Sequence, residues 1–131
     1  MKKYLLSFLV PVSILTQGCA HTPTEIRALG ERGRVEINQP YTQAASCVSR
    51  QMSETMIYGL LKKGINHSLR TYPDEGYAEI IGDQSTGGTY VVSIHSSGQN
   101  SSTVKIYVSN NMVFSTAITN DIKKSAINCI H

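Results

Sequence analysis

The stretch TYVVSIHSSGQNSSTVKIYV, residues 89–108, decides the fold class of the chain. In its two halves, 89–95 and 103–108, every second residue is apolar, and Gly98 and Asn100 lie between the halves. The apolar set is Tyr90, Val92, Ile94, Val104, Ile106 and Val108. A period of two is typical of strands with one buried and one wet face, and Gly with Asn indicates a turn. We therefore expect two antiparallel strands joined by a turn.

The residues before this stretch predict further strands. Residues 66–72 and 77–81 are strand-like and flank Pro73-Asp74-Glu75-Gly76, a turn signal. The Gly-rich residues 82–88 connect them to the next strand. Residues 35–37 alternate as well and form a candidate short strand before Pro40. The expected sheet is an antiparallel meander of three to four strands.

Two segments show the four-residue spacing of an amphipathic helix. The first is residues 41–62, whose apolar positions are Ala44, Val48, Met52, Met56 and Leu60. The second follows a cap at Asn110 or Asn111, and its apolar positions are Phe114, Ile118, Ile122, Ala126 and Ile130. With the strands, they predict a single α+β domain, residues 41–131, in which two helices pack on one face of the sheet.

The first residues have the pattern of an export signal. Lys2 and Lys3 precede residues 4–15, which carry no charge and are mostly apolar. This run is shorter than the roughly 20 residues of a membrane-spanning helix but fits the apolar region of a signal peptide. Leu15-Thr16-Gln17-Gly18-Cys19-Ala20 follows it and resembles a lipobox. The resemblance implies cleavage after residues 1–18, a diacylglycerol on Cys19 and an acyl chain such as palmitate on the new amino group.

The chain resembles small proteobacterial outer-membrane lipoproteins of unassigned activity. Besides the lipobox, the resemblance is carried by Tyr72-Pro73-Asp74-Glu75-Gly76-Tyr77 and by Val104-Lys105-Ile106-Tyr107 after a Ser/Gly-rich loop. It implies membrane contact through the lipid anchor, with residues 19–40 as lipidated cysteine and tether. Ala20, rather than Asp, follows the cysteine, which in this class implies the outer membrane, by default on its periplasmic side.

Two cysteines remain in an exported chain, Cys47 and Cys129. Each flanks the apolar stripe of one helix, and an even number in a small exported domain indicates a disulfide. A catalytic thiol or a metal site is the alternative, but neither cysteine has a CxxC partner. We expect a disulfide that joins the two helices.

The composition excludes a nucleic-acid partner. Without residues 1–18 the chain has ten Lys/Arg and nine Asp/Glu, a net charge of +1, and no basic cluster. The four histidines, His21, His67, His95 and His131, lack metal-ligand spacing, so neither a metal nor a cofactor is expected. His67-Ser68 and His95-Ser96 are adjacent pairs on strands and therefore point to opposite faces. We do not expect an enzyme.

The seven tyrosines and the absence of tryptophan favour an interaction surface, with Tyr77, Tyr90 and Tyr107 on strands as its candidates. The expected function is that of an envelope-anchored, non-enzymatic interaction or accessory module, whose partner is another envelope protein. A small-ligand or peptidoglycan-binding domain that uses the wet sheet face is one alternative. A hydrolase with residues gathered from separate strands is another.

Overall fold

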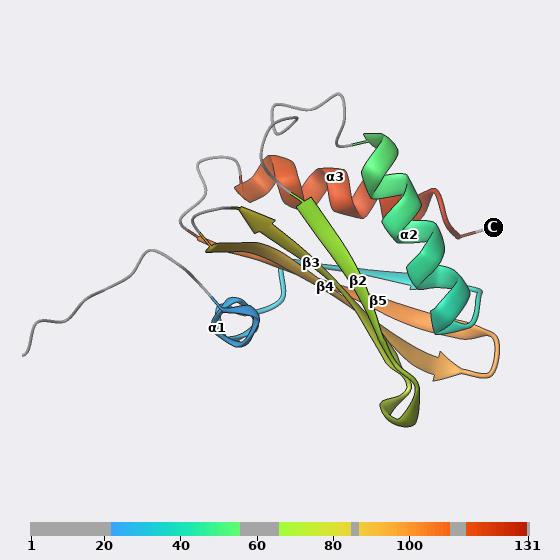
Figure 1. The fold of residues 1–131 in the computed structure, drawn as a ribbon. Coiled ribbons are helices and arrows are strands. Elements are labelled where there is room, and N and C mark those ends of the chain that lie inside the picture. Colours follow the sequence, from blue (N-terminus) through green and yellow to red (C-terminus); the bar gives the residue numbers. More distant parts are fainter. Residues whose placement is uncertain (1–21, 56–65, 85–86, 111–114, 131) are drawn as a thin grey trace, which may run out of the picture.

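The protein is described by a computed structural model, which covers residues 22–55, 66–84, 87–110 and 115–130. Its elements are α1 (Pro23–Ala28), β1 (Gly33–Ile37), α2 (Tyr41–Thr55), β2 (Asn66–Tyr72), the short 3₁₀ helix η1 (Pro73–Glu75), β3 (Tyr77–Gln84), β4 (Gly87–Gly98), β5 (Ser101–Val108) and α3 (Ser115–Ile127) (Figure 1). The predicted signal peptide, Cys19 and positions 56–62 of the first predicted helix lie outside the described residues. Within these ranges no helix is long and apolar enough to cross a membrane.

The described strands form one antiparallel sheet in the order β1-β5-β4-β3-β2. The α+β class is confirmed, but the sheet has five strands rather than three to four. The additional strand is β1, which pairs with β5 across a long sequence separation, Val35 opposite Val104. Strands β4 and β5 also extend closer to their connecting turn than the predicted ranges 89–95 and 103–108. A register shift between Ser96 and Gly98 lets the ladder continue almost to the turn.

Helices α2 and α3 cover one face of the sheet, which we call the inner face (Figure 1). The alternating residues of β3, β4 and β5 meet the two helical stripes there, and Ile80, Ile94 and Ile106 are completely buried. The disulfide between Cys47 and Cys129 joins the two helices, so the predicted pairing is confirmed. The helices are thus held to the sheet by apolar burial and to each other by a covalent bond.

A third helix, α1, packs against β4 and β5 on the opposite, outer face (Figure 1). The sequence pattern predicts helices on one face only, and α1 is absent from that prediction. Helix α1 is six residues long and has a single buried apolar side chain, Ile26, so it shows no apolar stripe in the sequence. Thr22 and Glu25 form a capping box at its start, which lets so short a helix persist. With β1, this helix brings part of the predicted tether into the folded domain.

Candidate interaction surface

The three tyrosines of the predicted surface do not share one face. Tyr77 and Tyr107 lie on the outer face, at opposite ends, since their partners in β4 are His95 and Val91 respectively. Tyr90 lies on the inner face and is completely buried, so its assignment to a surface is wrong. The reason is its register: Tyr90 alternates with Val92 and Ile94, and its ring lies over Gly82 of the neighbouring strand.

Tyr77 is the centre of a row of three stacked rings across β2, β3 and β4, which we call the aromatic ladder. The ring centroids of Tyr72 and Tyr77 are 4.7 Å apart, and those of Tyr77 and His95 are 5.2 Å apart, both at 20°. Stacking of this kind contributes about 0.5–1.5 kcal/mol per aromatic pair beyond area burial. All three side chains are only partly buried. Tyr72 and His95 were not among the predicted surface residues, although η1 sets Tyr72 directly opposite Tyr77.

The surroundings of Tyr77 and His95 favour the neutral forms of both side chains. Partial burial and the Glu75 carboxylate raise the pKa of Tyr77. Partial burial, together with Lys105 and Arg27, lowers the pKa of His95 from its ordinary value of 6.5. The same row continues across the sheet into Thr103, whose hydroxyl donates to the Glu36 carboxylate at 2.9 Å. The row therefore presents a neutral aromatic half and a polar half.

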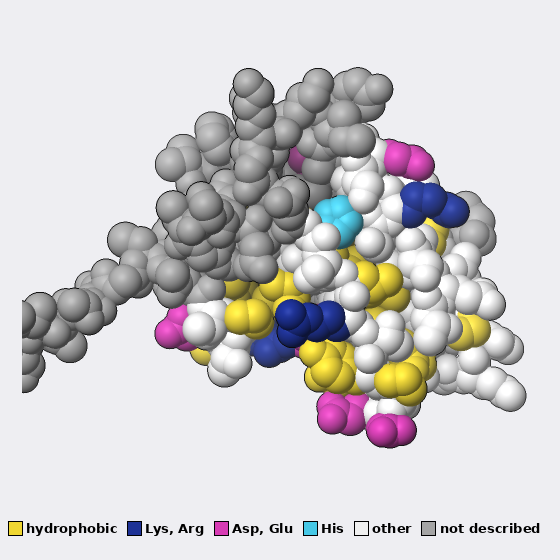
Figure 2. All heavy atoms as spheres, viewed as in Figure 1, with side chains coloured by type: hydrophobic (Ala, Val, Ile, Leu, Met, Phe, Trp, Pro, Cys, Tyr) yellow, Lys and Arg dark blue, Asp and Glu magenta, His cyan; other side chains and the backbone are white. Residues whose placement is uncertain are grey.

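Helix α1 leaves the ladder uncovered because it is anchored over the neighbouring rows. Arg27 forms an ion pair with Glu79 of β3, and Ile26 is buried against the sheet. Ile81, Val91 and Ser93, which share the outer face with Glu79, are buried as well. Figure 2 shows hydrophobic side chains interspersed with Lys and Arg over the exposed part of the sheet, and acidic side chains at the tip of the β2–β3 hairpin.

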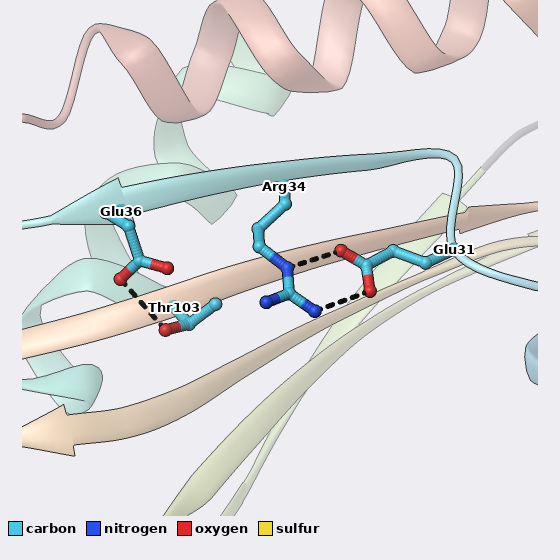
Figure 3. A network of polar contacts seen from close by, with 4 residues as sticks. All are labelled: Glu31, Arg34, Glu36 and Thr103. Carbon is cyan, nitrogen blue, oxygen red and sulfur yellow. Dashed lines mark hydrogen bonds and ion pairs between the residues drawn. The ribbon is translucent and has the colours of Figure 1, made fainter.

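The two edges of the sheet differ. On β1, the Arg34 guanidinium donates two hydrogen bonds to Glu31, at 2.6 and 2.9 Å, beside the Glu36–Thr103 contact (Figure 3). The hydrogen bond from Arg34 lowers the pKa of Glu31. On β2, by contrast, residues 68–71 are exposed, including Leu69 at 39%. The charged side chains of the β1 edge are thus paired within the domain, and the β2 edge faces solvent.

A polar groove of about 570 Å³ lies along α2 beside the disulfide, where α2 meets the end of α3. It is rich in amides: it contains three of the four glutamines whose side chains the structure describes, and Asn128. Arg50 is its one charged residue. Amide groups donate and accept hydrogen bonds at once, as do sugar hydroxyls and peptide groups. The groove is suited to a polar, neutral or anionic ligand.

No protein-family model and no curated protein matches this chain.

His67 of β2 contacts two serines of α2. Its Nε2 lies 3.3 Å from Ser49 Oγ and 3.1 Å from Ser53 Oγ, both on α2. The Ser53 hydroxyl also donates to the Ser49 carbonyl oxygen at 3.1 Å. The contact fastens the edge strand β2 to α2.

In the described part of the chain, no group of three or more His, Cys, Asp or Glu side chains is arranged to hold a metal ion. Ser68 and Ser96 point away from the histidines that precede them, as alternation along a strand requires.

Proposed function

We propose that the protein is an envelope-anchored, non-enzymatic interaction module that binds another envelope protein with the open end of its outer sheet face. The observation that carries the proposal is the aromatic ladder, Tyr72, Tyr77 and His95, which is partly exposed and left uncovered by α1. Pre-ordered aromatic side chains lose little conformational entropy on binding, and tyrosine is enriched among the residues that dominate interfaces.

The proposed location rests on two features of the chain. The charged and apolar pattern of residues 1–18 and the lipobox-like segment at Cys19 support export and lipidation, and Ala20 supports the outer membrane. The disulfide between Cys47 and Cys129 agrees with an oxidising compartment such as the periplasm. A protein held at a membrane surface in this way meets its partner at high local concentration, so a small contact surface is sufficient.

Site-specific photocrosslinking in intact cells tests this proposal. A photoreactive phenylalanine derivative replaces Tyr77 in one strain and Tyr107 in another, because both tyrosines lie on the outer face but at opposite ends. We expect a defined envelope protein to be crosslinked from position 77 and not from position 107. The crosslink should decrease with Cys19→Ala, which removes the anchor. Equal crosslinking from both positions, or none from position 77, would refute the proposal.

The amide-rich groove favours a second candidate function, binding of a small polar ligand or of peptidoglycan. Sedimentation with isolated peptidoglycan tests it, with Gln43→Ala and Arg50→Ala as groove variants. Tyr77→Ala is the matched control, because Tyr77 is not among the groove residues. Sedimentation that decreases in the groove variants alone would support this candidate, and sedimentation that is absent or unchanged in all variants would exclude it.

A further inference from the structure

Strand β2 is an open edge of the sheet. Among the described strands it pairs only with β3, and Ser68, Leu69, Arg70 and Thr71 are exposed. In an antiparallel strand about half of the N–H and C=O groups point away from the paired neighbour. An edge of this kind is a template for another extended segment, because main-chain hydrogen bonds supply affinity without a specific sequence.

Arg70 marks this edge with a cation that no described residue neutralises. It lies directly opposite Glu79 in the register, but Glu79 is paired with Arg27 of α1, and Arg70 makes no ion pair with any described residue. The opposite end of the same row is Arg34, and its charge is matched by Glu31. Arg34 and Arg70 thus occupy equivalent positions at the two edges of the sheet. Arg34 has a carboxylate partner, and Arg70 has none among the described residues.

The neighbours of Arg70 define what else an added strand would meet. Tyr72, two residues further along β2 on the same outer face, is the last ring of the aromatic ladder, so its far side lies toward the edge. Leu69, on the inner side, is 39% exposed at the border of the core. A strand beside β2 would therefore find a cation and a ring face on one side and an apolar contact on the other.

We propose that β2 binds an extended acidic segment of the partner protein as an additional strand, with a carboxylate opposite Arg70 and a ring or another flat side chain against Tyr72. The inference rests on the proposed interaction function and names the chemistry of its partner. A second copy of this chain is the less suitable occupant, since β2 (NHSLRTY) contains no carboxylate. A charge on an edge strand also opposes pairing between identical edges.

Selection from a display library of random dodecapeptides on the full-length chain, held in detergent micelles, tests the inference. We expect wild type to enrich peptides with Asp or Glu two positions from an aromatic residue. Arg70→Glu should replace the acidic residue by Lys or Arg, and Arg70→Gln should remove the charge preference. Arg34→Glu is the matched control at the other edge and should leave the wild-type preference unchanged.

A synthetic peptide with the enriched sequence then serves as the probe for affinity. We expect Arg70→Glu to weaken its binding about tenfold, since an attraction between opposite charges across the strands becomes a repulsion between like charges. Methylation of the peptide nitrogens that pair with β2 should abolish binding. No enriched motif, or an acidic motif that survives Arg70→Glu, would overturn the inference. Crosslinking from position 77 tests the proposed function separately. A failure of the peptide experiments alone would therefore overturn the β2 inference and not the proposed function.

Discussion

Arg27 of α1 forms an ion pair with Glu79 of β3, whose side chain is only 5% exposed, whereas the side chain of Arg27 is 35% exposed. This pair attaches the N-terminal helix to the outer face of the sheet, beside the aromatic ladder. Among the described residues, Arg27 is the ion-pair partner of this buried carboxylate and reaches it from solvent. The docked helix should therefore depend on this pair as well as on Ile26, whose side chain is completely buried.

Replacement of Arg27 by Met should destabilise the protein by about 1–3 kcal/mol. Removing one partner of a buried pair leaves an uncompensated charge, which costs about 3–5 kcal/mol when both groups are buried, and the exposure of Arg27 reduces that cost. The measurement is urea denaturation followed by circular dichroism. The double variant Arg27→Met with Glu79→Gln is the control and should recover most of the loss. A double variant no more stable than Arg27→Met would show that the charge of Glu79 is not the cause.

Gly82→Ala should also destabilise the protein, by about 1–3 kcal/mol, because overpacking a well-filled core forces side chains from their positions. A Cβ at Gly82 would overlap the ring of Tyr90, which is completely buried. Gly33→Ala is the control, since the nearest atom to a Cβ there is 3.4 Å away, at the flexible end of Ile106. Thermal unfolding compares the two variants. Equal melting temperatures for both would contradict the close packing of Tyr90 on Gly82.

Tyr90 was predicted to lie on the surface but is completely buried. The alternation that groups Tyr90 with Val92 and Ile94 already implies a core position. The type of residue, an aromatic with a polar tip, led to its assignment to the surface. Gly82 explains the outcome, because a strand residue without a side chain leaves room for a ring from the neighbouring strand. That relationship crosses two strands and is not visible in either one alone.

The elements that sequence patterns missed are those that depend on distant partners. The stripes of α2 and α3 and the alternation of β5 are local, and the positions of Cys47 and Cys129 beside those stripes were sufficient to predict their disulfide. Helix α1 is too short for a stripe. Arg70 lies opposite Glu79 without an ion pair to it because Glu79 pairs with Arg27 of α1. Arg27 is far from the other two residues in the sequence, so no local pattern predicts which arginine pairs with Glu79. Of the three residues of the aromatic ladder, only Tyr77 was therefore among the predicted surface residues.

The disulfide should contribute about 4 kcal/mol to the free energy of unfolding. It joins residues separated by 82 positions, and the loop-entropy model gives a contribution of this size for a loop of that length. Reduction with dithiothreitol, or Cys47→Ser with Cys129→Ser, should lower the denaturation midpoint strongly. The reductant should have no effect on the double serine variant, which serves as the control. Equal midpoints for the oxidised and reduced protein would show that the bond does not constrain the unfolded chain.

The stability of the protein should decrease as the pH falls below the ordinary histidine pKa of 6.5, partly because of His67. Burial lowers the pKa of this side chain, so the unfolded chain binds a proton at a higher pH than the folded protein does. Its contribution is therefore complete above pH 6.5, is lost as the pH falls, and stays constant once the pH lies below the pKa in the folded state.

His67→Gln should reduce this dependence, because glutamine does not titrate and its amide can both donate to and accept from the Ser49 and Ser53 hydroxyls. The measurement is the difference in unfolding free energy between wild type and variant across pH 5 to 8, which removes the contribution of the carboxylates. His95→Gln is the comparison. The pKa of His95 is also lowered, but this side chain stacks on Tyr77 and contacts no serine of α2 in the described residues. A wild-type-minus-variant difference that does not change with pH would show that His67 has the same pKa in the folded and unfolded chains.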